Sequence, residues 1–294
     1  MRNFFYETLG LLACALLTCA TAWAQPDNMT TLPDLPYAET EQRTLLLDLY
    51  LPDDPASAPL IVWIHGGAWR FGDKSAPPIL GIVEQGFAVA SLDFRSSTEA
   101  IFPAPIHDIK AAVRYLRAQA ASHGYDGDRI VLWGHSSGAH LATLTAVTAG
   151  NPALEGELGD HTDTDSAVQA VIAYAGPSNL TTILYQSTEH GVSVRAPSLA
   201  LLLGVEPGAP GFEQQATLAS PALQLGATAP PLLLVHGVQD NQVPINQAIE
   251  LELAYQRREL DVTSAWLLNA GHGGSEYYSA AALARVTEFL HRVL

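Results

Sequence analysis

Residues 128–142 have the sequence DRIVLWGHSSGAHLA, which carries the strongest structural signal in the chain. The first half contains the apolar run RIVLW, which is typical of a strand buried inside a parallel sheet. The second half is small and apolar, and it predicts a helix packed against that sheet. Residues 134–138 between them match the pattern G-x-S-x-G. This arrangement predicts a tight strand-to-helix turn that lifts the Ser136 hydroxyl above the sheet, at a helix N-terminus that favours negative charge.

Strand-like and helix-like runs alternate on both sides of this turn. The expected strands are 45–51, 59–64, 87–94, 129–134, 168–175, 231–235 and 263–268. The expected helices are 105–122, 137–149, 245–260 and 275–294. Such alternation predicts an α/β fold, in which helices cover both faces of a parallel sheet. The Pro-rich, polar residues 25–40 are expected to form an irregular lead-in, and residues 25–294 a single domain.

One segment, residues 177–229, breaks this alternation. It contains several Pro and Gly residues and a single helical patch at 197–203. Long irregular insertions in compact domains are usually lids or binding loops. This one follows the C-terminal end of a strand, where open α/β sheets bind ligands. We therefore expect a lid, with a passive surface excursion as the alternative.

The charge balance argues against two classes of partner. The 294 residues include 14 Lys and Arg against 30 Asp and Glu, which gives a formal charge of −16. Only two lysines are present, Lys74 and Lys110. Nucleic acids and anionic lipid surfaces both need a basic footprint, so we expect neither as a partner.

The first 24 residues predict a signal peptide. Arg2 precedes an apolar run at 11–19, and Ala22-Trp23-Ala24 matches a cleavage site. Both cysteines of the chain, Cys14 and Cys19, fall inside this segment. We therefore expect an exported protein, periplasmic or secreted, with no stable membrane insertion after cleavage. An uncleaved anchor and a lipoprotein attached through Cys14 are the alternatives.

A serine nucleophile needs a base, and the base needs an acid to orient it. Among ten histidines, His272 lies in the glycine-flanked loop NAGHGG after the last expected strand. Asp240 lies just after another strand, in HGVQD at 236–240. Both positions are at C-terminal strand ends, where Ser136 is also expected. The competing acids are Glu206, inside the insertion, and Asp261, at the wrong end of its strand.

A third motif supplies backbone donors. The sequence HGGAW at 65–69 directly follows the strand LIVWI, and its glycines allow a close backbone approach. Ser137 would add a further N–H group next to Ser136. Together such amides could stabilise a developing oxyanion. The alternative is that HGG is only a glycine turn.

These motifs together resemble the α/β-hydrolase superfamily. Within it, the chain is similar to exported carboxylesterases of the hormone-sensitive-lipase type and the feruloyl/acetyl-esterase type. The resemblance implies a mostly parallel eight-stranded sheet with an insertion after the sixth strand. It also implies ester hydrolysis through an acyl-enzyme without a cofactor, with oxyanion donors at Gly67, Ala68 and Ser137. The lipase-type pattern usually has a third glycine where this chain has Ala68.

The expected function is a serine carboxylesterase with Ser136 as nucleophile, His272 as base and Asp240 as acid. Export and the resemblance favour small acyl groups, acetyl or feruloyl, on a small molecule or a polysaccharide. An amidase, arylformamidase or peptidase on the same triad is an alternative, and a catalytically silent binding protein is another. The chain has no HExxH, P-loop or G-x-G-x-x-G motif, so we expect no metal or nucleotide cofactor.

Overall fold

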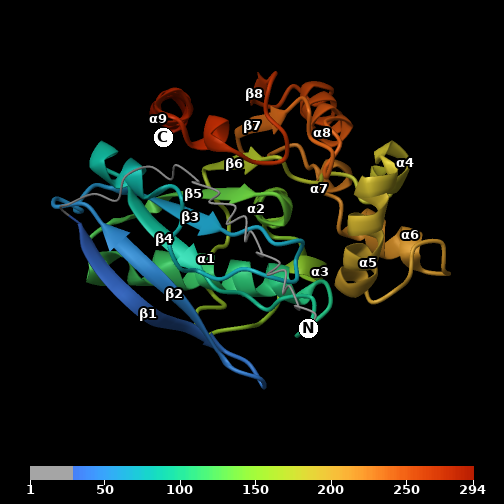
Figure 1. Cartoon of the computed structure of the whole chain (residues 1–294). Helices are drawn as coiled ribbons and strands as arrows, with labels where there is room; N and C mark the ends of the chain where they lie inside the picture. Colours follow the sequence, from blue (N-terminus) through green and yellow to red (C-terminus); the bar gives the residue numbers. More distant parts are fainter. Residues whose placement is uncertain (1–28) are drawn as a thin grey trace, which may run out of the picture.

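One eight-stranded sheet organises residues 29–294, the part of the chain that the computed structural model describes. The strands are β1 (Thr30–Glu39), β2 (Thr44–Leu51), β3 (Pro59–Ile64), β4 (Ala88–Leu92), β5 (Asp126–His135), β6 (Ala170–Tyr174), β7 (Leu232–Gly237) and β8 (Val262–Leu267). Their order is β1-β2-β4-β3-β5-β6-β7-β8 (Figure 1). The pairs β1/β2 and β2/β4 are antiparallel, and all other neighbours in the sheet are parallel. The predicted mostly parallel sheet of eight strands is confirmed.

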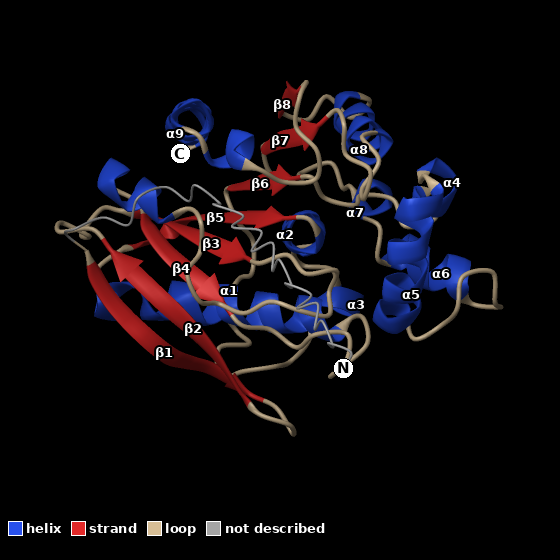
Figure 2. Cartoon of the chain, in the orientation of Figure 1, coloured by secondary structure: helices blue, strands red, loops and turns tan. Residues whose placement is uncertain are grey.

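Helices lie on both faces of the sheet (Figure 2). The helices outside the insertion are η1 (Leu80–Gln85), α1 (Ala104–His123), α2 (Ser137–Val147), α3 (Pro152–Glu155), α8 (Asn246–Gln256), η2 (Ser275–Tyr278) and α9 (Ala280–Val293). Helices α1, α2 and α8 pack into one apolar cluster, whereas η1 and α9 pack into a second. Alternate strand residues enter the two clusters. In β5, Leu132 joins the first cluster and Trp133 the second, as expected for a strand buried on both faces.

The first strand corrects one expectation. Residues 30–39 were expected to form part of an irregular lead-in, but they form β1, the edge strand paired with β2. Its pairing is irregular between Leu32 and Leu35 and again between Pro36 and Ala38. Prolines cannot donate to a ladder, so they are confined to edges and bulges of a sheet. The prolines that suggested a loop are therefore compatible with this particular strand.

The insertion follows β6, as predicted, but it is more helical than the sequence suggested. It contains α4 (Ile183–Gln186), α5 (Glu189–Leu203), α6 (Phe212–Leu218) and α7 (Pro221–Gln224). Helix α5 begins well before the expected patch because Thr188 caps it, accepting a hydrogen bond from the Gly191 N–H at 3.1 Å. In Figure 1, α4, α5 and α6 lie beyond the arrowheads of the central parallel strands.

The predicted signal peptide, residues 1–24, lies outside the described residues and stays a prediction. Within residues 29–294, no helix combines the length and the apolar character needed to cross a bilayer.

Candidate active site

Ser136 occupies the turn between β5 and α2 in a strained backbone conformation. Its φ of 57° lies in the left-handed region, where an L-residue costs about 1–2 kcal/mol. The turn is too tight for side chains at its two glycines. A Cβ on Gly134 would lie 2.3 Å from the Gly138 backbone, and a Cβ on Gly138 would lie 2.0 Å from the Ile64 carbonyl oxygen. The glycines on either side of Ser136 are therefore required by backbone contacts on both sides of the turn.

Ser136, His272 and Asp240 lie within hydrogen-bond distance in series. The Ser136 Oγ is 2.8 Å from the His272 Nε2, and the His272 Nδ1 is 2.7 Å from the Asp240 Oδ2. An ionised carboxylate can only accept, so Nδ1 carries the ring proton. The Nε2 lone pair then faces the serine hydroxyl, which donates to it. This is the tautomer that a general base for Ser136 needs.

The Asp240 carboxylate is fully buried and receives several hydrogen bonds. Its Oδ1 accepts from the Gln242 and Val243 N–H groups at 2.8 and 2.9 Å. Its Oδ2 lies 3.2 Å from the Nε2 of His236. Burial alone would raise the pKa of Asp240, but the hydrogen bonds from His236 and His272 outweigh it and hold that pKa well below its usual range. Asp240 is thus an anion at neutral pH.

His236 is buried at the end of β7, where it contacts the Asp240 carboxylate. The same Nε2 lies 2.9 Å from the Val243 carbonyl oxygen. Because neither acceptor carries a hydrogen, Nε2 must be protonated and shared between the two. The one signal in the sequence that could have indicated this contact is the short spacing, because His236 lies four residues before Asp240.

Two residues that sequence reasoning missed tie the loop of His272 to the ends of neighbouring strands. The His135 Nε2 donates to the His272 carbonyl oxygen at 2.8 Å. The Tyr277 hydroxyl accepts from the Gly237 N–H at 2.7 Å and donates to the Gly271 carbonyl at 3.2 Å. Tyr277 therefore links the strand end before Asp240 to the loop before His272. No sequence motif marks Tyr277, since its role depends on a contact across 40 residues.

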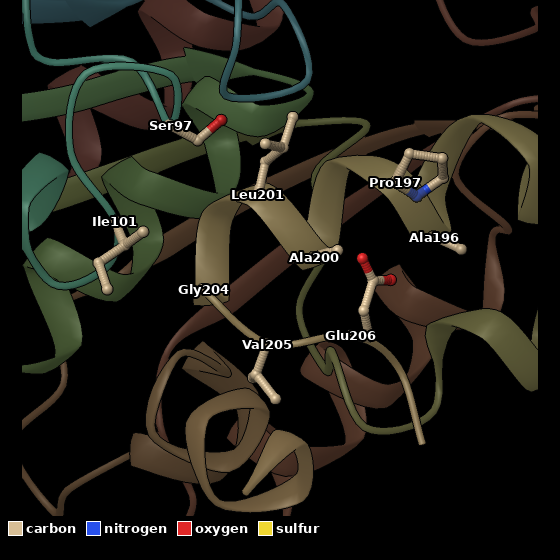
Figure 3. Close-up of a pocket in the computed structure, with 9 residues that line it drawn as sticks. All are labelled: Ser97, Ile101, Ala196, Pro197, Ala200, Leu201, Gly204, Val205 and Glu206. Atoms are coloured by element: carbon tan, nitrogen blue, oxygen red, sulfur yellow. The ribbon is translucent and has the colours of Figure 1, made fainter. Parts of the chain in front are cut away.

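The two competing acids are elsewhere. Asp261 forms an exposed ion pair with Arg292 at the start of β8. Glu206 lines a cavity of about 670 Å³ between α5 and the segment that carries Ser97 and Ile101 (Figure 3). None of Ser136, Asp240 and His272 lines this cavity.

Within residues 29–294, no group of three His, Cys, Asp or Glu side chains is placed to hold a metal ion.

The segment after β3 lies directly against Ser136. A Cβ on Gly66 would be 2.9 Å from the His135 carbonyl oxygen and 3.4 Å from the Ser136 Cβ. Only a residue without a side chain allows this approach without displacing a neighbour. The HGG motif is therefore more than a turn, because Gly66 brings the loop against the serine.

Gly67, Ala68 and Trp69 all have positive φ values, 121°, 54° and 61°. Among the described residues, no group accepts a hydrogen bond from the N–H of Gly67, Ala68 or Ser137. Ala68 thus adopts the left-handed conformation in which the related pattern has glycine, and its amide remains unpaired as well. Unpaired backbone amides can stabilise a negatively charged oxygen, and the loop that carries two of these three lies against Ser136 at Gly66.

This strand order and the Ser136–His272–Asp240 arrangement at the strand ends define an α/β-hydrolase. The BD-FAE family model matches residues 47–255, and the chain belongs to this family. The Mycobacterium tuberculosis protein "Esterase LipQ" is 32% identical over 81% of this chain and 56% of its own length. The chain spans about half the length of the curated relatives it matches.

Two solved structures extend the similarity to most of the chain. A "truncated form of carbohydrate esterase from gut microbiota" is 30% identical with a TM-score of 0.78, covering 90% of this chain and 95% of that one. Esterase 2 of Thermogutta terrifontis, solved with propionate bound, is 25% identical with a TM-score of 0.71, covering 88% and 93%.

The contact at Gly66 gives a first prediction. In Gly66→Ala, the new methyl group would push the loop away from Ser136 and misplace its amides. We expect a fluorophosphonate probe to label Ser136 about 100-fold more slowly, with the fold retained by circular dichroism. Gly226→Ala is the matched control, because a Cβ there meets no atom within 4 Å. Equal labelling rates in the two variants would contradict the placement of the loop.

Two buried histidines beside the site give a second prediction. Burial lowers the pKa of His135 to about 4, assisted by the charge of His272, and burial likewise lowers the pKa of His140 to about 4. In the unfolded chain, histidines titrate near pH 6.5. Between about pH 4 and pH 6.5, the two histidines are therefore protonated in the unfolded chain but neutral in the folded protein. The stability contributed by these neutral rings is therefore complete above about pH 6.5 and is lost as the pH falls towards 4.

The measurement is urea unfolding at pH 7.5, 6 and 5. We expect the free energy of unfolding to fall with pH by up to about 1.4 kcal/mol per unit for each histidine. His135→Gln keeps a donor for the His272 carbonyl but does not titrate, so its slope should be smaller. A wild-type stability that stays constant from pH 7.5 to 5 would be inconsistent with two buried neutral rings.

Proposed function

We propose that this protein is a serine carboxylesterase. The observation that carries the proposal is the pair of hydrogen bonds from Ser136 through His272 to buried Asp240, at 2.8 and 2.7 Å. A serine hydroxyl is a weak nucleophile at neutral pH, and this arrangement supplies both the base and the anion that orients it. The unpaired amides next to Ser136 supply the third requirement, a site for negative charge.

In the proposed reaction, the Ser136 Oγ attacks the ester carbonyl carbon while the His272 Nε2 takes its proton. The carbonyl oxygen becomes an oxyanion held by the N–H groups of Gly67, Ala68 and Ser137. His272 then gives the proton to the alcohol oxygen as the C–O bond breaks, which leaves the acyl group on Ser136. Water, deprotonated by His272, attacks this acyl carbon and releases the acid. Ser136 recovers its proton from His272, so the cycle needs no other reactant.

Asp240 stabilises the imidazolium that forms during each half of this cycle. Because the pKa of Asp240 is held well below its usual range, its carboxylate stays ionised while His272 gains and loses the proton. The amides of Gln242 and Val243 fix one carboxylate oxygen, which leaves the other to accept from the two histidines. His236 thereby fixes the direction in which Asp240 presents its charge to His272.

We propose esters of small acyl groups, acetyl or feruloyl, as the substrates, with a small molecule or a carbohydrate as the alcohol part. Two relatives support this choice. One is named a carbohydrate esterase, and the other has been solved with propionate and with butyrate bound. The acidic surface, with 30 Asp and Glu against 14 Lys and Arg, suits a neutral substrate better than an anionic one.

The test is a panel of initial rates on p-nitrophenyl acetate, butyrate, octanoate and decanoate, and on methyl ferulate. We expect acetate, butyrate or ferulate esters to be hydrolysed much faster than the decanoate. Ser136→Ala should lower kcat at least about 1,000-fold on each substrate, because it removes the nucleophile. A preference for decanoate would overturn the small-acyl proposal while leaving the esterase proposal standing.

The same panel separates the alternatives. Folded wild-type protein that cleaves none of the esters but hydrolyses an anilide would be an amidase on the same triad. Failure of a fluorophosphonate probe to label Ser136 in folded protein would favour a catalytically silent binding protein.

The second histidine on Asp240 gives a further prediction. His236→Leu removes the N–H donor from the carboxylate, so Asp240 should orient His272 less well. We expect kcat to fall about tenfold, equivalent to roughly 1.4 kcal/mol, with KM nearly unchanged. His236→Gln retains an N–H donor of similar reach and should recover part of the loss. If the Leu variant keeps the wild-type kcat, His236 has only a packing role.

A further inference from the structure

The side chain of Trp69 is held by contacts that lead to the insertion after β6. It directly follows the amides of Gly67 and Ala68, and only 2% of its surface is exposed. Its indole Nε1 donates to the Nδ1 of His140 at 3.0 Å, and the two rings meet edge to face. His140 lies one turn into α2, the helix that begins after Ser136. A side-chain hydrogen bond therefore joins the loop after β3 to helix α2.

The other nitrogen of His140 bonds to the insertion. His140 is completely buried, and its Nε2 lies 2.7 Å from the carbonyl oxygen of Ala219, between α6 and α7. A carbonyl can only accept, so Nε2 carries the proton and Nδ1 keeps the lone pair that the indole needs. Both bonds are satisfied by one neutral tautomer alone. Two consecutive hydrogen bonds therefore connect Trp69 through His140 to the insertion.

A second contact reaches Trp69 from the insertion. The guanidinium carbon of Arg195, in α5, lies 5.5 Å from the centre of the Trp69 ring, within the range of a cation–π interaction. The Arg195 Nη2 also donates to the Gln242 carbonyl at 3.4 Å. Gln242 in turn donates its N–H to Asp240. The insertion thus contacts both the loop with the unpaired amides and the loop with the acid.

The backbone of this loop needs such support. Ala68 and Trp69 both have positive φ values, which L-residues rarely adopt. Gly66 and Gly67 have no side chain, and Ala68 has a single methyl group. The Trp69 indole is therefore the first side chain after the glycines that the rest of the protein can hold. Its backbone has a second anchor, because its carbonyl accepts from the Ser97 N–H at 2.7 Å.

We propose that His140 is a positioning residue for the oxyanion site, acting through the Trp69 indole and braced by the insertion at Ala219. The proposal rests on the proposed function, because it assigns a purpose to the amides of Gly67 and Ala68. In this proposal, the insertion is a fixed support for the loop after β3. Loss of the indole bond lets the loop relax, so the amides stabilise the transition state less while ground-state binding of the ester changes little.

The first experiment compares the same substitution at two buried tryptophans. Trp69→Phe keeps an aromatic ring but removes the N–H donor. Trp63→Phe is the control, since Trp63 is also buried, in β3 just before the loop, but belongs to the cluster on the other face of the sheet. With p-nitrophenyl acetate, Trp69→Phe should lower kcat about 10- to 100-fold with KM within about threefold. Trp63→Phe should keep kcat within about twofold, whatever it does to Tm.

The second experiment asks whether Trp69 and His140 act as one unit. His140→Leu should lower kcat to a similar extent, and the double variant with Trp69→Phe should be no slower than the slower single variant. His140→Gln offers one acceptor and one donor, as the neutral ring does, and should recover part of kcat. Multiplicative losses in the double variant would overturn the coupling, even if each single variant is slow.

The failures of the two proposals can be told apart. If wild-type protein shows no Ser136-dependent hydrolysis, the proposed function fails and the positioning role fails with it. If the wild type is active and Trp69→Phe retains kcat to the same extent as Trp63→Phe, only the positioning role is overturned. If His140→Leu does not fold, the Trp69→Phe comparison still decides the question, because it leaves the imidazole in place.

Discussion

The site depends on a backbone contact between the end of β3 and the turn after β5. A side chain on Gly138 would collide with the Ile64 carbonyl, and one on Gly66 would collide with the His135 carbonyl. Two neighbouring parallel strands therefore bring their C-terminal ends together more closely than side chains permit. This approach places the amides after β3 beside the serine after β5.

The histidines near the site are used in three different ways. His272 presents a lone pair to Ser136. His236 donates from Nε2 to Asp240 and the Val243 carbonyl. His135 also donates from Nε2, to the backbone carbonyl of His272. His140 donates from one nitrogen and accepts at the other. The partner of each ring determines its tautomer, and burial keeps His135 and His140 neutral. Asp240 consequently accepts N–H groups from two rings, His236 and His272, and His272 is the one that also bonds to Ser136.

The sequence predicted the parts that depend on short patterns. The strand, turn and helix around Ser136 could be recognised because the turn itself demands glycines at two fixed positions. His272 and Asp240 could be selected because parallel strands bring their C-terminal ends to a common edge. The strand β1 was missed because its prolines suit an edge as well as a loop, and only pairing with β2 distinguishes the two. His236, Tyr277 and His140 acquire their roles through contacts between segments, which no local pattern encodes.

The outer edge of the sheet has a consequence for how the protein behaves in concentrated solution. Strand β1 has prolines at 33 and 36, and its register with β2 shifts twice. A straight edge strand with all its amides available is a template on which further strands can assemble. Missing donors and an interrupted register make β1 a poor template. The same irregularity that hid this strand from sequence reasoning thus guards one side of the sheet against aggregation through strand addition.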